Sequence, residues 1–336
     1  TIRDFLPKEH LLSYVEAVLR VYNLLGRRDD MYKARIKILV HEIGAEKFAA
    51  LTEEEWQFTR ESELHLPDSE IARIRAYFAP PAYEDIPAES SALEDALGAN
   101  AAFARWHTSN VTEHRQAGYA IASVSLKPTG GIPGDASADQ MDAIADMALD
   151  LSFDEIRVTH EQNVVLAHVR KDQLFELWQR LGQHDLATPN VSLITDVICC
   201  PGMDYCSLAT ARSVPVSQRI SERFRDLDRQ HDIGALDLNI SGCINACGHH
   251  HAGHIGILGV DKRGKEFYQI TLGGHQGYDA SIGKIIGPAF SSDAIVDAVE
   301  DVVTTYLEQR QDGEQFLDTY RRVGALPFKE KLYDVA

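Results

Sequence analysis

The apolar positions of residues 8–56 recur at the spacing of amphipathic helices, and polar residues 26–30 interrupt the pattern. The spacing therefore predicts two helices, and we expect a helical segment over residues 1–60. The predicted apolar faces comprise Leu11, Leu12, Val15, Val18 and Leu19 in the first helix and Ile36, Ile38, Leu39 and Ile43 in the second. Several prolines then punctuate residues 61–112, which we interpret as a connecting segment running over the surface.

The pattern changes from residue 119 onward, where short alternating runs separate longer helical ones. A strand is predicted first, then a helix, two strands and a second helix. A β-α-β-β-α order favours an antiparallel or mixed sheet with helices on one face, which is an α+β fold. The predicted elements cover residues 119–126, 139–151, 155–160, 163–169 and 173–182, within an expected domain at residues 113–187.

A second α/β domain is predicted over residues 188–336. Its strands at residues 191–199 and 236–241 each lead directly into cysteines, and a helix through Val216, Ile220 and Phe224 separates them. Residues 254–273 read as a hairpin, and residues 291–311 as a long helix. Because both cysteine segments follow strand ends, we expect them to meet on one side of a sheet.

Composition narrows the possible partners. The chain has 336 residues, of which 44% are hydrophobic and 25% charged, which is ordinary for a globular protein. The net charge of −18 argues against nucleic acid as a partner, because phosphate binding depends on clustered Lys and Arg. No apolar run is long enough to span a bilayer, so we expect no membrane partner and a cytoplasmic location.

Four of the five cysteines fall into two pairs, Cys200 with Cys206 and Cys243 with Cys247. Two short loops that each deliver two thiolates are typical of a buried iron-sulfur site. A zinc site and unligated core cysteines remain alternatives, although five residues between Cys200 and Cys206 is wide for zinc. A reducing compartment disfavours disulfides. Cys199 points away from Cys200 if the segment is a strand, so it reads as a small buried hydrophobe.

The cysteine spacing and the motif G-C-x-N-x-C-G around the second pair resemble the sulfite and nitrite reductase hemoprotein family. The resemblance extends to residues 5–38, 157–169 and 268–274. It implies a ferredoxin-like module followed by a cluster domain. It also implies a [4Fe-4S] cluster held by Cys200, Cys206, Cys243 and Cys247. Cys247 would in addition be shared with the iron of siroheme and would therefore be the catalytic ligand.

Four further residues acquire expected roles from the resemblance. Asn245 is expected to fix the second cysteine loop or touch the macrocycle, and Gln162 and Asn163 to lie near the cofactor. His249 belongs to a histidine-rich run that could contact the cofactor, complete a zinc site with the cysteines, or have an ordinary structural role.

The resemblance implies an assimilatory enzyme that reduces sulfite to sulfide with six electrons, or alternatively nitrite to ammonia. The substrate would be a small oxyanion, and the electrons would come from a ferredoxin or a flavoprotein reductase. The family is longer than this chain, which we therefore expect to be its C-terminal part, incomplete and inactive by itself. A non-enzymatic iron-sulfur electron carrier is the alternative from another functional class.

Overall fold

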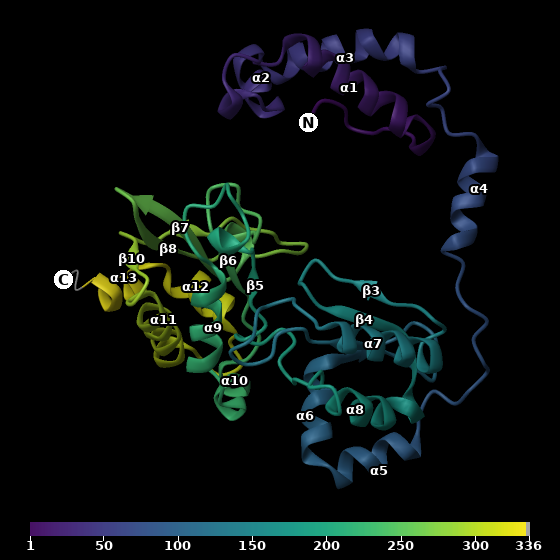
Figure 1. The fold of residues 1–336 in the computed structure, drawn as a ribbon, viewed down its shortest axis with the longest axis vertical. Coiled ribbons are helices and arrows are strands. Elements are labelled where there is room, and N and C mark those ends of the chain that lie inside the picture. The colour runs from purple at the N-terminus through teal and green to yellow at the C-terminus, as the bar shows by residue number, and fades with distance from the viewer. Residues whose placement is uncertain (334–336) are drawn as a thin grey trace. The chain divides into compact units, whose positions relative to one another are not determined.

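The computed structural model describes residues 1–333 and contains two compact units, residues 1–83 and the residues from 84 onward (Figure 1). The α+β class predicted from the sequence is confirmed. The predicted domain boundaries at residues 60, 112 and 187 stay predictions, and residues 334–336 of the last predicted domain lie outside the described residues. No described helix is long and apolar enough to cross a membrane.

The N-terminal unit is helical, as expected, but most of the predicted apolar face of its first helix is wrong, because only Val18 of that face packs against the buried clusters. Leu11, Leu12, Val15 and Leu19 are exposed, whereas the helix buries Ser13, Tyr14, Ala17 and Val21. The reason is that Trp56 and Phe48 of α3 pack on this other side. The helices are α1 (Leu11–Leu25), α2 (Ile36–Ile43), α3 (Ala45–Thr59) and α4 (Asp68–Tyr77).

The next region, residues 84–187, is a four-stranded domain with sheet order β1-β2-β4-β3, antiparallel throughout. Phe103 and Trp106 of α6 are completely buried in its core together with residues of α7 and α8, so the interpretation of residues 61–112 as a surface segment is wrong for this helix. Ser137 and Gln140 form a capping box that begins α7. Its elements are α5 (Ser91–Ala99), α6 (Ala101–Asn110), β1 (Val111–Glu113), β2 (Tyr119–Val124), α7 (Ala138–Leu151), β3 (Arg157–Val158), β4 (Val164–Arg170) and α8 (Leu174–Gly182).

Residues 188–333 form a six-stranded domain with sheet order β10-β8-β7-β6-β5, to which β9 adds by pairing with β8. Strands β5, β6 and β7 are parallel, and β7 and β8 form the predicted hairpin. The strands are β5 (Ile198–Cys199), β6 (Leu238–Ser241), β7 (Ile255–Lys262), β8 (Lys265–Leu272), β9 (Lys284–Ile285) and β10 (Phe290–Ser291). The helices are α9 (Val214–Arg223), α10 (Leu227–Ile233), α11 (Ile295–Gln309), α12 (Phe316–Val323) and α13 (Leu326–Tyr333).

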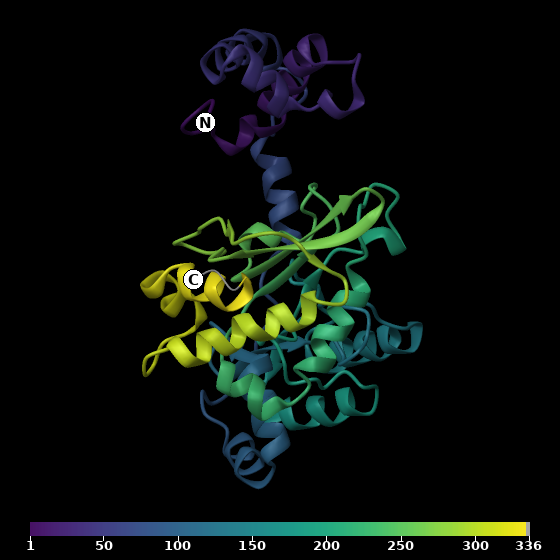
Figure 2. The same ribbon diagram turned by 90° about the vertical axis from the view of Figure 1, so that its left-hand side faces the viewer.

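The core of this domain lies between the sheet and its helices. Figure 2 shows α11 in yellow lying along the sheet, and its Val299, Val302 and Val303 share one buried cluster with Ile257 and Ile270 of the strands. Burying such side chains stabilises the fold by roughly 1.5–3 kcal/mol each. The sheet that carries the cysteines therefore packs on a largely apolar core.

The strand predicted at residues 191–199 is much shorter than expected. Only Ile198 and Cys199 are extended in β5, while residues 190–196 form turns. The physical reason is Asp196, whose carboxylate accepts hydrogen bonds from the Ser192 main-chain N–H and from the buried ammonium of Lys127. These bonds fold the segment back on itself before the strand can begin.

Candidate metal centre

The two cysteine segments leave the same edge of the sheet. Cys200 follows β5, and Cys243 follows β6 after one residue. Because β5 and β6 are parallel neighbours, their carboxyl ends lie together. The two loops are also joined directly, since the carbonyl of Gly242 accepts hydrogen bonds from the N–H groups of Thr210 and Ala211 at 2.9 and 3.0 Å.

One cysteine sulfur is held by both loops. The Sγ of Cys200 accepts a hydrogen bond from the main-chain N–H of Gly242 at 3.0 Å, and the hydroxyl of Ser213 lies 3.5 Å away. The two contacts fix the position of the Cys200 sulfur between the two cysteine segments.

Two glycines allow the backbones to approach closely at this point. A Cβ on Gly242 would lie 2.7 Å from the carbonyl oxygen of Ala211 and 2.9 Å from the Cα of Gly202. A Cβ on Gly248 would overlap the carbonyl group of Ile240. A larger residue at Gly242 would force the two cysteine segments apart, and one at Gly248 would push the second loop away from β6.

The four paired cysteines differ in their access to solvent. Cys200 and Cys243 are buried, Cys206 is half-buried and Cys247 is exposed. A single zinc ion would hold four sulfurs only about 3.8 Å apart. Within residues 1–333, no three cysteine sulfurs lie within 4.8 Å of one another. Among the described residues, the cysteines therefore do not form a ready single-ion site.

Cys199 lies beside these ligand candidates but belongs to the hydrophobic core. It is buried among residues of the sheet and its helices, and its Sγ donates to the carbonyl oxygen of Cys200 at 3.3 Å. Burial raises the pKa of the Cys199 thiol far above its usual range. The residue therefore stays protonated, which agrees with its reading as a small hydrophobe.

The side-chain amides of Gln162 and Asn163 form hydrogen bonds with residues that lie just before Cys200. Gln162 binds the main chain of Cys199, and Asn163 binds the side chain of Asp196. The amide of Gln162 bonds to both main-chain groups of Cys199, at 2.7 and 2.8 Å. Asn163 is buried, accepts the N–H of Leu126 at 3.1 Å and donates to Asp196 at 3.0 Å. These contacts of both amides are structural, and their direct contact with a cofactor stays a prediction.

Asn245 and His249 lie in and just after the second cysteine loop. Asn245 is half-buried, and His249 is exposed with a left-handed backbone at φ 52°. The main-chain carbonyl of His249 accepts a hydrogen bond from Asn239 at 3.1 Å, which holds the end of the loop against β6. The imidazole of His249 is therefore left on the surface near Cys247.

The other histidines of this run turn inward. His250 is buried, and burial lowers its pKa to about 4. His254 lies within reach of Asp237 and His275, with all three donor atoms within 4.8 Å. The N–H of Asp237 donates to Nδ1 of His254, so the ring proton sits on Nε2, 3.4 Å from Nδ1 of His275. The group is therefore a hydrogen-bond chain, and its proton occupies the direction that a metal would need.

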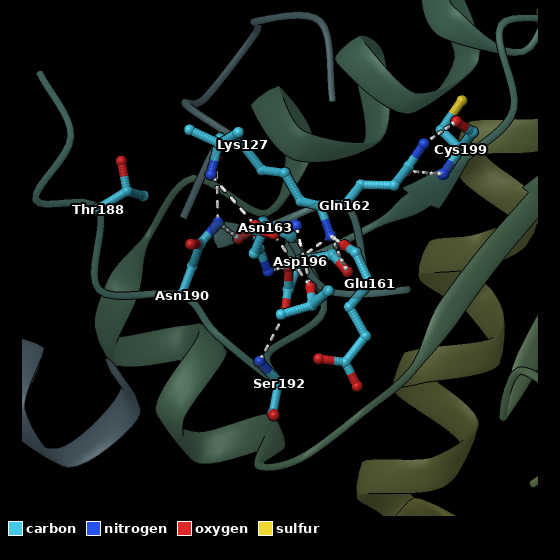
Figure 3. Close-up of polar contacts among 12 residues, drawn as sticks. Lys127, Glu161, Gln162, Asn163, Thr188, Asn190, Ser192, Asp196 and Cys199 are labelled. Carbon is cyan, nitrogen blue, oxygen red and sulfur yellow. Dashed lines mark hydrogen bonds and ion pairs between the residues drawn. The ribbon is translucent and has the colours of Figure 1, made fainter. Parts of the chain in front are cut away.

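One buried ion pair was not predicted from the sequence. Lys127 and Asp196 meet at 2.6 Å with side chains only 2% and 6% exposed, and Lys127 also donates to the carbonyl oxygen of Glu161 (Figure 3). The pair connects the four-stranded and six-stranded domains just before the first cysteine. The only signal in the sequence was a lysine in an otherwise apolar and glycine-rich stretch at residues 119–134.

Two family models match the chain. One, described as "Nitrite and sulphite reductase 4Fe-4S domain", matches residues 1–59 and 191–335. The other, described as "Nitrite/Sulfite reductase ferredoxin-like half domain", matches residues 114–184. The second match covers β2, β3 and β4 with α7 and α8, and the first includes both cysteine loops.

Individual sulfite and nitrite reductases also match the chain, with low sequence identity. Sulfite reductase (ferredoxin) 1 of Mycolicibacterium paratuberculosis is 26% identical over 93% of this chain and 51% of its own length. A chloroplastic ferredoxin–nitrite reductase of Arabidopsis thaliana is 25% identical over 89% of this chain and 46% of its own. The structure of Mycobacterium tuberculosis NirA shares the fold, with a TM-score of 0.66, 24% identity, and coverage of 97% of this chain and 55% of that one. The chain thus spans about half the length of these relatives.

Proposed function

This chain belongs to the nitrite and sulphite reductase 4Fe-4S family, and from that membership we propose that it supplies the cluster-binding part of a siroheme-dependent reductase. The reaction we assign is the six-electron reduction of sulfite, which takes up six protons and releases sulfide and three waters. Reduction of nitrite to ammonia is the alternative. Relatives with either activity in their names match the chain at nearly equal identity.

The observation that carries the proposal is the contact between the two cysteine loops. The N–H that precedes Cys243 points at the sulfur of Cys200, so the two pairs share one hydrogen-bonded unit. Four cysteines on two such loops are the donor set of a cubane. Cys200, Cys206, Cys243 and Cys247 would hold the [4Fe-4S] cluster. The cluster with siroheme would supply one-electron transfer and an iron site for the oxyanion.

The four proposed ligands have different roles, because they differ in their exposure to solvent. Cys200 and Cys243 are buried and fixed by the sheet, so they anchor the centre and exclude water from its inner side. Cys247 is exposed and can therefore face a second cofactor, which supports its assignment as the shared ligand. Asn245 and His249 lie on the same loop and are the nearest candidates in sequence for contacts with the macrocycle.

The partner that we propose is a small one-electron donor protein in the cytoplasm. Ferredoxin is named in the relatives, and a flavoprotein reductase is the alternative. Because the net charge is −18, the anionic substrate would need a local positive site against the overall negative field. A role as an iron-sulfur electron carrier without siroheme is the competing function for this chain taken by itself.

The test is anaerobic reconstitution of the chain with iron, sulfide and siroheme, followed by metal analysis and a visible spectrum. We expect about four irons per chain and a broad cluster absorption. Weak or absent siroheme bands and no turnover are expected for these 336 residues alone. A broad absorption without any siroheme bands fits both the carrier and an incomplete reductase, whereas siroheme bands beside the cluster absorption favour the reductase over the carrier. A colourless protein with one zinc per chain would contradict both functions.

Sulfite and nitrite can be distinguished as substrates in any preparation that retains siroheme. Each anion is added to the reduced, siroheme-loaded chain, and the change in the siroheme bands is titrated. If sulfite is the substrate, it perturbs the bands at lower concentration than nitrite does. The Cys199→Ser variant serves as the control for handling, because Cys199 lies in the core and its loss leaves the four ligands in place.

A further inference from the structure

Gln162 lies in the turn between β3 and β4, but its side chain serves the neighbouring domain. Its Oε1 accepts a hydrogen bond from the Cys199 N–H at 2.7 Å, and its Nε2 donates to the Cys199 carbonyl oxygen at 2.8 Å (Figure 3). One side-chain amide thereby satisfies both main-chain groups of one residue. This is the pattern that an adjacent β-strand would provide.

The position of β5 explains why such a partner is needed. β5 is the last strand in the sheet order, so only one of its sides pairs with β6. On that side, the N–H of Cys200 donates to the carbonyl oxygen of Ile240 at 3.1 Å. The main-chain groups of Cys199 point to the open edge, where unpaired groups are costly when buried. Gln162 thus replaces the missing strand at this residue.

The turn that carries Gln162 is held firmly. Gln162 has a left-handed backbone with φ 60°, a conformation that its surroundings must enforce. The next residue, Asn163, is 2% exposed and connects Leu126 to Asp196 through its amide. The buried Lys127–Asp196 pair lies in the same network. A buried ion pair adds little net stability, so its use here is to fix one arrangement of the two domains.

The constraint on Cys199 is transmitted to the sulfur of Cys200. Cys200 is the next residue, its N–H is bound to Ile240, and its Sγ accepts the N–H of Gly242. If Gln162 releases Cys199, the main chain of β5 can shift along its open edge. The sulfur then moves relative to the Gly242 N–H. Hydrogen bonds to ligand sulfurs tune the potential and electronic structure of a cluster.

We propose that Gln162 is a positioning residue for the metal centre, which sets the place of the Cys200 sulfur by clamping the main chain of Cys199. The proposal rests on the proposed function for its cluster, and it gives Gln162 a role other than direct contact with the cofactor. Through this clamp, the ferredoxin-like half-domain controls the cluster ligand that lies at the edge of the other sheet.

The experiment compares Gln162→Met with a matched control, Gln140→Met. Methionine keeps the length of the side chain and removes both hydrogen bonds. Gln140 also bonds to two main-chain groups, the N–H of Ser137 and the carbonyl oxygen of His184, but away from the cysteines. Both variants are produced as the full chain, and circular dichroism checks that they fold.

The first readout needs no cofactor. Alkylation of Cys200 by iodoacetamide in the cluster-free chain is followed by peptide mass spectrometry. We expect a rise of about tenfold in Gln162→Met, from the loss of two hydrogen bonds, and no change in Gln140→Met. Equal rates in wild type and Gln162→Met would overturn the clamp. If Gln162→Met does not fold, Gln162→Glu replaces it, because an ionised carboxylate keeps the acceptor and loses the donor.

The second readout is the electron paramagnetic resonance spectrum of the reduced, reconstituted cluster. We expect shifted g values and a shifted midpoint potential in Gln162→Met at unchanged iron content, with Gln140→Met matching wild type. An unshifted spectrum would overturn the positioning role. A wild-type chain that takes up no cluster would defeat the proposed function instead, and the alkylation rates would still decide whether Gln162 holds Cys200.

Discussion

The two cysteine loops are held in place by different contacts. The loop from Cys200 to Cys206 is held from outside, by the amide of Gln162 behind Cys199 and by the N–H of Gly242 at its first sulfur. The loop from Cys243 to Cys247 is held by its own close backbone packing, and it ends exposed. The comparison teaches that the first loop can be adjusted by another domain, whereas the second is built into the sheet and directs Cys247 outward.

The largest expected effect follows from the packing of the second loop. A Cβ at Gly248 would overlap the carbonyl group of Ile240, so Gly248→Ala must displace β6 or the loop. We expect a loss of about 3 kcal/mol or more in the free energy of unfolding, measured by urea denaturation of the cluster-free chain. Gly98→Ala is the control, because nothing lies within 4 Å of its Cβ position and alanine favours the helix. Equal stability of both variants would refute the close packing.

The second largest expected effect is a loss of folding stability at acidic pH through His250, which follows the second loop. His250 follows it, is buried, and has a pKa lowered from 6.5 to about 4 by burial. The folded chain therefore binds fewer protons than the unfolded chain between these values, and stability falls as pH drops below 6.5. We expect on the order of 2 kcal/mol to be lost by pH 4 through this residue.

The measurement for His250 is the unfolding free energy of the cluster-free chain at several pH values. His250→Gln should flatten the acid limb of the profile, whereas His160→Gln, at an exposed position, should leave it unchanged. An acid limb that is identical in all three proteins would assign the pH dependence to other groups.

A smaller effect is expected behind the first loop. Cys199→Ser keeps a donor to the carbonyl oxygen of Cys200 but places a more polar group in the core. We expect a loss of about 1 kcal/mol in thermal or urea unfolding, with iron content and spectrum unchanged. Loss of the cluster in this variant would mean that the ligand set has been assigned wrongly.

The smallest effect on stability should come from the residue with the largest proposed functional effect. Cys247 is exposed, so Cys247→Ser should change the unfolding free energy of the cluster-free chain by less than about 0.5 kcal/mol. After reconstitution, the variant should lose the coupling between cluster and siroheme, seen as uncoupled spectra. Retained coupling would require another shared ligand and would remove the distinction between the two loops.

Much of the fold could be predicted from the sequence, because it depends on local patterns. The strands and helices of residues 119–182 follow from their periodicity, and the β7–β8 hairpin from its alternation around a glycine turn. The first cysteine strand was overestimated because Asp196 is captured by Lys127, a residue 69 positions away in the sequence. The contact of the Gln162 amide could not be predicted for the same reason, because its partner is the main chain of Cys199 in another domain.

Two helices show where the limit lies. Residues 11–22 of α1 and 295–306 of α11 have similar sequences, and the same family model covers both. The pairs Val15 and Val299, Glu16 and Glu300, Val18 and Val302, and Tyr22 and Tyr306 are identical. Nevertheless, Leu19 is 52% exposed, whereas Val303 at the corresponding position is completely buried.

The sequence alone determined that both segments are amphipathic helices and that four cysteines stand in two pairs at the ends of strands. Only the tertiary structure decided which apolar face is covered, because burial requires a second surface that local periodicity does not specify. α11 has the sheet against its face, whereas within residues 1–83 α1 packs on α3 mainly through Tyr14, Ala17 and Val21. In the same way, the sequence spacing placed Cys200 and Cys247 in one set of candidate ligands. The packing of the chain decided that Cys200 is buried and that Cys247 is exposed.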